Sequence, residues 1–205
     1  MNILAIGSHP DDLEYGCGGT LLKLSARGNK VSLFVLSAGE IGGDPKARIK
    51  EQERSAKILK AKLYLGDFKD TEIVLSKKLI NSIENVIRKV NPTLIFVHHL
   101  EDTHQDHRNV SQATITATRY IRNVLFYEVP TTVNFSPTVF VDIGKIKGKK
   151  LKLLESHKSQ VHLTRVAELS ILESAGSSSI FRGFQNRVKH AEGFVPLRLA
   201  LDFNL

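Results

Sequence analysis

Residues 93–107 read TLIFVHHLEDTHQDH, an apolar run that passes directly into four histidines and three carboxylates. A short apolar run of this kind predicts a buried parallel strand, with the polar residues at its carboxyl end. The segment His9-Pro10-Asp11-Asp12 follows a second apolar run, residues 3–7, in the same way. Open α/β sheets bind ligands at the carboxyl edge of their strands, so the two segments predict one shared site.

Apolar runs alternate with segments of helical periodicity along the chain. The strands are expected at residues 3–7, 31–36, 63–65, 93–97, 124–127 and 138–143. The helices are expected at residues 21–26, 47–59, 73–90, 110–121, 147–157 and 164–178. Strand, helix, strand repeated in this way predicts an α/β protein, a Rossmann-like three-layer α/β/α domain with a mostly parallel sheet.

Composition predicts one domain spanning residues 1–205, because 205 residues with 41% hydrophobic and 24% charged side chains are ordinary for a globular protein. No apolar run approaches the ~20 residues of a membrane helix. The first residues also lack a basic region before their apolar segment, so we expect no transmembrane segment and a cytoplasmic location. Cys17 is the only cysteine, which excludes an intramolecular disulfide and predicts a small buried residue.

The formal net charge of +8 suggests an anionic partner. The basic residues are scattered apart from a run between Lys145 and Lys152, and no aromatic residues interleave that run. We interpret the run as a solvated helix start and expect no nucleic-acid partner, although an anionic substrate or membrane surface remains open. The run and the apolar tail at 197–205 are candidate contacts of a homo-oligomer, but a covering strand or helix explains the tail equally well.

The ligand types in the two polar clusters suit zinc and other borderline divalent ions. A catalytic zinc takes three protein ligands and leaves one position for water. His9 and Asp12 with one or two of His104 and His107 can supply that set. Single residues of these types after a strand are commonly surface or helix-capping groups, yet two clusters at the ends of parallel strands favour a metal.

Glycines at 16, 18 and 19 lie between the first strand and the first helix, where a dinucleotide-binding loop would also lie. Their spacing differs from that fingerprint, and the carboxylates of the preceding His-Pro-Asp-Asp would repel a pyrophosphate. We interpret these glycines as turn and close-packing residues that let the first helix approach the polar loop.

At these motifs the chain resembles the zinc-dependent N-deacetylases of the PIG-L and LmbE type. The first family motif is matched by residues 5–12 with Glu14 and residues 16–20, and the second by residues 101–107. Agreement continues along nearly the whole chain, at Gly39-Glu40 with Arg48 and Glu51, and at residues 127–130, 140–143, 157–160 and 191–194. The chain departs from many relatives at Gly7-Ser8, which leaves the motif intact.

The resemblance implies a role for each residue of the two motifs. The implied zinc ligands are His9, Asp12 and His107, with other divalent transition metals as alternatives. Asp11 resembles the family's general base, His104 the histidine that polarises the substrate carbonyl, and Asp106 the carboxylate that orients this histidine. The adjacent residues Asp11 and Asp12 must point differently in a tight turn, which is consistent with different roles.

The implied activity is metal-assisted removal of the N-acetyl group from an N-acetylglucosamine-type sugar or its conjugate, a small molecule or an oligomer, with release of acetate. Asp11 takes a proton from the attacking water, and protonated His104 stabilises the oxyanion. Arg48 and His157 are candidate substrate-binding residues, with an ion pair to Glu51 or Glu53 as the alternative for Arg48. The histidines interpreted as structural or surface residues are His98, His99, His162 and His190.

Three alternatives use the same residues. One is another metal-dependent amidase of this family. The second is an iron(II) oxygenase, which also uses two histidines and a carboxylate, although such sites are typical of all-β barrels. The third is a non-catalytic module for anionic carbohydrate or lipid, in which His104 closes the metal site as a fourth ligand. A cysteine nucleophile is disfavoured, because Cys17 has no histidine in its own segment.

Overall fold

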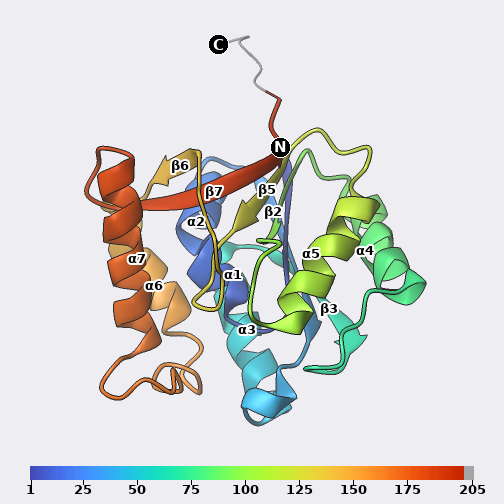
Figure 1. The fold of residues 1–205 in the computed structure, drawn as a ribbon, viewed down its shortest axis with the longest axis horizontal. Helices are drawn as coiled ribbons and strands as arrows, with labels where there is room; N and C mark the ends of the chain where they lie inside the picture. Colours follow the sequence, from blue (N-terminus) through green and yellow to red (C-terminus); the bar gives the residue numbers. More distant parts are fainter. Residues whose placement is uncertain (201–205) are drawn as a thin grey trace.

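A computed structural model describes residues 1–200 of the chain (Figure 1). The described residues form one seven-stranded sheet in the order β3-β2-β1-β4-β5-β7-β6. The strands are β1 (Asn2–Gly7), β2 (Lys30–Ser37), β3 (Lys62–Phe68), β4 (Leu94–His98), β5 (Val124–Tyr127), β6 (Val139–Asp142) and β7 (Ala191–Arg198). The first five strands pair in parallel, and β7 pairs antiparallel with both β5 and β6.

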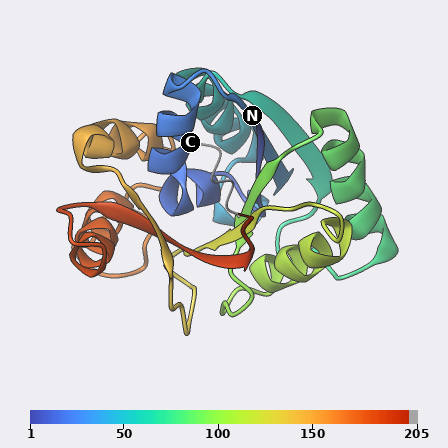
Figure 2. The ribbon, with the colours of Figure 1, turned by 90° about the horizontal axis from the view of Figure 1, so that it is seen from above.

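Helices cover both faces of the sheet, as Figure 2 shows from above. One face carries α1 (Asp12–Gly16), α2 (Gly18–Ala26), α3 (Pro45–Leu59), α6 (Lys147–Leu154) and α7 (Ile171–Gln185). The other face carries α4 (Lys77–Val90) and α5 (Gln105–Ala117), and two short 3-10 turns, η1 (Glu40–Gly42) and η2 (Gly144–Ile146), lie in connections. The predicted Rossmann-like α/β/α architecture is confirmed. None of the helices within residues 1–200 is long and apolar enough to cross a membrane.

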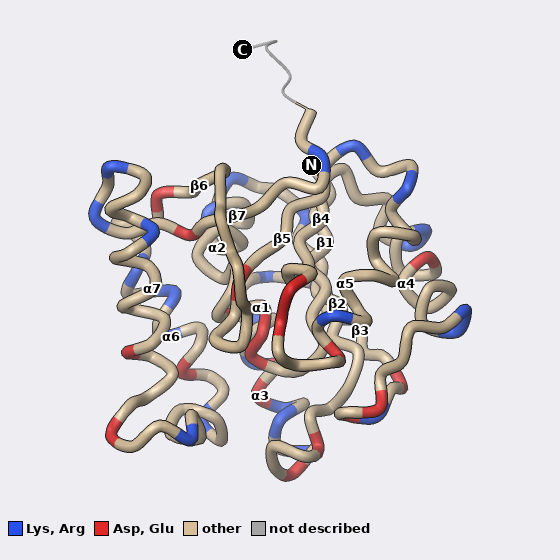
Figure 3. The backbone as a smooth tube through the Cα atoms, in the orientation of Figure 1, with Lys and Arg blue, Asp and Glu red and all other residues tan. Residues whose placement is uncertain are grey.

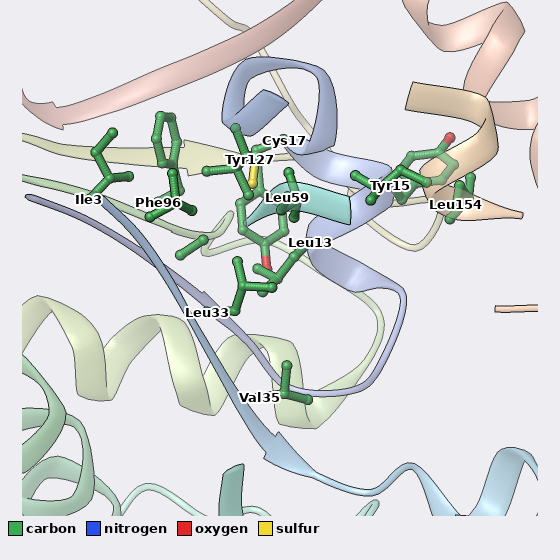
Figure 4. Packing of buried hydrophobic residues seen from close by; sticks show 14 of the residues in the cluster. Ile3, Leu13, Tyr15, Cys17, Leu33, Val35, Leu59, Phe96, Tyr127 and Leu154 are labelled. Carbon is green, nitrogen blue, oxygen red and sulfur yellow. The ribbon is translucent and has the colours of Figure 1, made fainter. Parts of the chain in front are cut away.

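Two clusters of buried apolar side chains join these layers, one on each face of the sheet. Figure 4 shows the cluster under α1 and α2, where Tyr127 and Cys17 lie among leucines and Phe96. The Tyr127 hydroxyl donates to the Ile6 carbonyl at 2.9 Å. A Cβ at Gly16 would lie 2.2 Å from the Tyr127 ring, so glycine is needed for α1 to approach the sheet this closely.

Several helices begin or end several residues away from the boundaries expected from the sequence. The helix expected at 110–121 begins at Gln105, because the His104 side chain caps its first turn. The helix expected from residue 73 begins at Lys77 after the Ser76 cap, and the one expected to end at 157 ends at Leu154. The helix expected at 164–178 runs instead over Ile171–Gln185, where Ser170 and Glu173 form a capping box.

Strand β7 was not expected from the sequence, because Gly193 and Pro196 interrupt its apolar pattern. Leu197, the first residue of the expected apolar tail, belongs to this strand, and residues 201–205 of the tail lie outside the described residues. The strand carries Glu192 into the core, where its carboxylate accepts hydrogen bonds from the backbone N–H groups of Gly19 and Thr20 at 2.8 and 2.7 Å. Glu192 therefore caps the amino end of α2.

The Lys150 ammonium completes this buried group and departs from the expected solvated run. Its Nζ atom lies 2.6 Å from Glu192 Oε1 and donates to the Tyr15 carbonyl at 2.6 Å. Both Lys150 and Glu192 are only 4% exposed. A charge pair this deep is costly to break, because either partner left alone is a buried unpaired charge.

We expect Glu192→Ala to lower the free energy of unfolding by about 3–5 kcal/mol, since Lys150 and the first N–H groups of α2 lose their acceptor. Urea denaturation of the variant measures this loss. Glu72→Ala is the matched control, because Glu72 is exposed and its contact with Lys69 spans 3.9 Å, so its effect should stay within about 0.5 kcal/mol. Equal stability of the two variants would contradict the capping role.

Candidate metal centre and active site

The two polar clusters meet where the strand order of the sheet reverses. Strands β1 and β4 are paired neighbours, yet α2 and α3 cover one face while α4 and α5 cover the other. Such a switch point opens a crevice at the carboxyl ends of the strands. The loop after β1 carries His9, and the first turn of α5, which follows β4, carries His107.

Three side chains at this crevice converge on one point. His9 Nδ1 lies 3.2 Å from His107 Nε2. Asp12 Oδ2 lies 3.5 Å from His9 Nδ1, and Asp12 Oδ1 lies 3.5 Å from His107 Nε2. The ligands of a tetrahedral zinc, each about 2.0–2.1 Å from the ion, are about 3.3 Å from one another. Two imidazoles and a carboxylate at these separations therefore fit a zinc ion.

Each of the two histidines also contacts buried carboxylates through its other ring nitrogen. His9 Nε2 lies 3.0 Å from Asp70 Oδ1 and 3.1 Å from Asp106 Oδ2. His107 Nδ1 lies 3.2 Å from Asp102 Oδ1. A carboxylate behind a histidine fixes its tautomer and orientation, and this arrangement is typical of metal-binding histidines.

A second group of potential ligands shares His9 and comprises His9, Asp70, His104 and Asp106. The Asp106 carboxylate already accepts hydrogen bonds from the N–H groups of Thr71 and Ile73, and that of Asp70 accepts one from Ile41. A metal in this group would compete with the bonds at both oxygens of Asp106, whereas Asp12 accepts a backbone N–H, that of His9, at Oδ2 alone. The geometry thus favours the group of His9, Asp12 and His107.

Electrostatics keep Asp12 ionised. Burial raises its pKa, but the imidazoles of His107 and His98 lower it more, and the net pKa lies well below the usual value for aspartate. His98, expected to be structural or at the surface, is fully buried with Nε2 3.1 Å from Asp12 Oδ2. Burial lowers the pKa of His98 to about 4, so this imidazole is neutral at pH 7.

Asp11 has different partners from Asp12 and a strained backbone. Its φ angle is 93°, in the left-handed region that only a few residue types tolerate. Its carboxylate lies 3.6 Å from the Arg48 guanidinium and lines the same cavity as the two histidines. Burial raises the pKa of Asp11 to about 6 although Arg48 opposes the shift. A carboxylate with this pKa is suited to accept and return a proton near neutral pH.

The structure differs from the expected geometry of His104 in two respects. Its Nδ1 accepts the backbone N–H of Asp106 at 3.2 Å, whereas the Asp106 carboxylate contacts His9. Burial lowers the pKa of His104, and the charges of His107 and His9 lower it further. The imidazole is therefore neutral rather than protonated, and its single proton lies on Nε2, where it can be donated into the cavity.

Arg48 is buried, and its ion pair is with Asp11 rather than with Glu51 or Glu53. Its guanidinium donates to the carbonyls of Gly39 at 2.6 Å and Pro10 at 2.8 Å, so it joins the loops after β1 and β2. Glu51 instead accepts from the N–H and hydroxyl of Ser159. Arg48 lines the cavity, but both of its side-chain hydrogen bonds go to backbone carbonyls of the protein.

His157, the second candidate for substrate contact, lies behind the cavity. It is 1% exposed, and its Nε2 lies 3.3 Å from Glu14 Oε2. Burial lowers the pKa of His157, but Glu14 raises it more, so the net pKa is above the usual value. Glu14 also accepts hydrogen bonds from Gln52 and Ser55. This arrangement places His157 as a buried partner of Glu14 under the site.

A cavity of about 400 Å³ opens over these groups. Its polar lining includes His9, Asp11, Asp70, His104 and His107. Asp70 follows β3. It was not expected at the site, because the strand predicted there was not followed by a recognised polar cluster. Asp102 lies within the polar cluster at residues 98–107, but no role was predicted for it.

Figure 3 shows acidic positions gathered on the central loops near α1 and lysines and arginines mainly on the outer helices and turns.

Comparison with known proteins identifies relatives over most of the chain. The family model described as PIG-L, GlcNAc-PI de-N-acetylase, matches residues 4–118. An uncharacterised deacetylase of Escherichia coli, YaiS, is 36% identical over 77% of this chain and 90% of that protein. The diacetylchitobiose deacetylase of Thermococcus kodakarensis is 30% identical over 77% of this chain and 69% of that protein.

The fold is also shared with a solved structure. The N,N'-diacetylchitobiose deacetylase of Pyrococcus horikoshii, in complex with an inhibitor, superposes with a TM-score of 0.85 and 24% identity. The match covers 98% of this chain and 87% of that chain. The similarity extends to β7 and α7, which lie beyond the residues matched by the family model.

We expect Arg48→Met to lower the free energy of unfolding by about 2–5 kcal/mol, because two buried carbonyls lose their donor. Arg54→Met on the same helix is the control, since the Arg54 side chain is 52% exposed and lies 3.7 Å from Glu51; its effect should stay within about 0.5 kcal/mol. Chemical denaturation compares the two variants. Similar losses in both would show that Arg48 does not join the two loops.

Proposed function

The chain belongs to the PIG-L family, and we propose that it is a zinc-dependent deacetylase of an N-acetylglucosamine-type sugar or its conjugate. The reaction hydrolyses the acetamide and releases acetate and the free amine. Other divalent transition metals can take the place of zinc, because the ligand types accommodate several of them. The observation that carries the proposal is the convergence of His9, Asp12 and His107 beside Asp11.

In this proposal His9, Asp12 and His107 hold the metal, and the carboxylates behind both histidines keep their rings oriented. A bound zinc ion supplies Lewis-acid activation of the water and of the acetamide carbonyl. With three protein ligands, a bound zinc would keep the open coordination position that distinguishes catalytic from structural zinc sites. We assign His104 no ligand role, because it lies outside the group of His9, Asp12 and His107 and its Nδ1 already accepts a backbone hydrogen bond.

Asp11 is the proposed general base and then the general acid. Its carboxylate takes a proton from the attacking water and later returns it to the leaving amine. The raised pKa of about 6 is suited to both steps, since the group is mostly ionised at pH 7 yet holds a proton readily. Arg48 keeps the carboxylate ionised and positioned.

His104 is proposed to stabilise the oxyanion that forms on the acetamide carbonyl. The neutral ring holds its proton on Nε2 and donates it as a hydrogen bond, which supplies preorganised electrostatic stabilisation. The cap on α5 fixes the ring before substrate arrives. No covalent intermediate is needed.

Acetate release from a panel of N-acetylated sugars tests the proposal. The panel contains N-acetylglucosamine, diacetylchitobiose and simple glycosides. Diacetylchitobiose is included because two of the similar proteins are named diacetylchitobiose deacetylases. Release is expected to stop when a chelator removes the metal and to return when zinc is added. Chelator-insensitive release would refute the metal-dependent mechanism, and no release from any member would refute the proposed substrate class.

We expect His107→Ala to lose stoichiometric zinc and His104→Ala to retain it, because only His107 is a proposed ligand. Zinc content after gel filtration, measured by inductively coupled plasma spectrometry, separates the two outcomes. His162→Ala serves as the control, since His162 is exposed and does not line the cavity. Loss of zinc from His104→Ala would make His104 a ligand and the site a closed one.

We expect Asp11→Asn to retain zinc and to lose roughly 10²–10⁴-fold in turnover, the usual contribution of a general base. Asparagine tolerates the positive φ of residue 11, so the loop should keep its conformation. Steady-state acetate release measures the loss, with thermal unfolding as the check on folding. Activity close to that of the unsubstituted protein would remove Asp11 from the base role.

A further inference from the structure

The cavity over the site has an apolar part that deacetylation itself does not require. The segment between α6 and α7, which loops below these helices in Figure 1, contributes three apolar side chains to the lining, and the first residue of α7 contributes a fourth. We call these side chains the apolar wall; they are Leu163, Val166, Leu169 and Ile171. They share one cavity with His9, Asp11 and His104.

Two residues of the apolar wall are unusually exposed for their type. Leu163 and Val166 are each 57% exposed. A single exposed apolar side chain is common on any protein and carries no meaning. Here two of them lie in one short segment and face a cavity, an arrangement that marks ligand-binding grooves. Covering them with an apolar group would remove their surface from water.

The segment that carries the apolar wall is held in one conformation by its own hydrogen bonds. The Thr164 hydroxyl donates to the Leu169 carbonyl at 2.6 Å and accepts from the Val166 N–H at 3.2 Å. The Ile171 N–H donates to the Val161 carbonyl at 3.0 Å, which closes the loop. A preformed wall loses little conformational entropy when a ligand packs on it.

The size and chemistry of the cavity point to a two-part ligand. About 400 Å³ falls in the range that binds drug-sized molecules and exceeds what one sugar ring needs. Sugar hydroxyls find partners among the polar side chains but none on leucine, valine or isoleucine. A glycoside carries its aglycone on the anomeric carbon, next to the carbon that bears the acetamide, so a bound glycoside holds both parts within one cavity.

We propose that the apolar wall is a subsite for the apolar aglycone of an amino-sugar glycoside. This inference rests on the proposed deacetylase function and specifies its substrate class. The aglycone packs on Leu163 and Val166 while the acetamide reaches Asp11 and His104. The wall then sets specificity through kcat/KM without taking part in the chemistry.

The test compares kcat/KM for the methyl and hexyl glycosides of N-acetylglucosamine, in both anomeric forms, with the zinc-loaded protein. We expect the hexyl glycoside to be preferred by roughly tenfold or more, since each buried methylene contributes to discrimination. The double variant Leu163→Ser, Val166→Ser should lose this preference and keep the methyl rate. Both probes are uncharged, so neither forms an ion pair with Arg165, which also lines the cavity.

Ile180→Ser is the matched control, because Ile180 on α7 is 54% exposed and does not line the cavity; it should keep the hexyl preference. Equal kcat/KM for the two glycosides would overturn the subsite and leave the proposed function standing. A preference for N-hexanoyl over N-acetyl glucosamine, without a hexyl-glycoside preference, would place an acyl chain on the wall and also overturn it.

If no glycoside is turned over, the proposed function fails, and binding then decides the subsite by itself. Calorimetric titration with hexyl glucosaminide and methyl glucosaminide, the product-like amines, provides that measurement. Tighter binding of the hexyl compound, lost in the double variant, would support the wall as a binding surface. Equal binding, or a hexyl preference that survives in the double variant, would overturn it.

Discussion

The double contact of His9 is the constraint on which the site depends. One ring nitrogen faces His107 and Asp12, and the other faces Asp70 and Asp106. These partners come from the start of α1, the segment after β3 and the first turn of α5. They can meet only if β1 and β4 are neighbours and the strand order reverses between them. The fold thus serves to bring three distant segments around one imidazole.

Burial gives these contacts their strength and makes the residues behind the site as important as those that line it. Asp106 is fully buried and Asp102 is 3% exposed, and each carboxylate lies against a histidine. In a site of low dielectric such pairs keep the histidines oriented. The same surroundings raise the pKa of Asp11, which has a charged partner in Arg48 but no histidine pressed against it. Two adjacent aspartates therefore differ in pKa because they differ in partners.

The sequence predicted the parallel strands and the two clusters well, because both are local patterns. An apolar run followed by His-Pro-Asp-Asp indicates where a strand ends and what lies at its end. Asp70, Glu14 and Glu192 act through contacts with His9, His157 and Lys150, which lie far from them in the chain. No local sequence pattern predicts these contacts. His104 illustrates the same limit, since its neutral state follows from a cap and from burial that only the fold reveals. Strand β7 was missed because its glycine and proline obscure the alternation of a strand.

The proposed function depends on a division of roles among the histidines of the site: His9 and His107 bind the metal, whereas His104 faces the substrate. X-ray absorption spectroscopy at the zinc edge of the loaded protein tests it most directly, because it counts imidazoles around the ion. We expect two imidazoles, those of His9 and His107, with the carboxylate of Asp12 and an additional light-atom ligand that is not a protein side chain. A shell containing three imidazoles would contradict it, since His104 would then close the site as a ligand instead of facing the substrate.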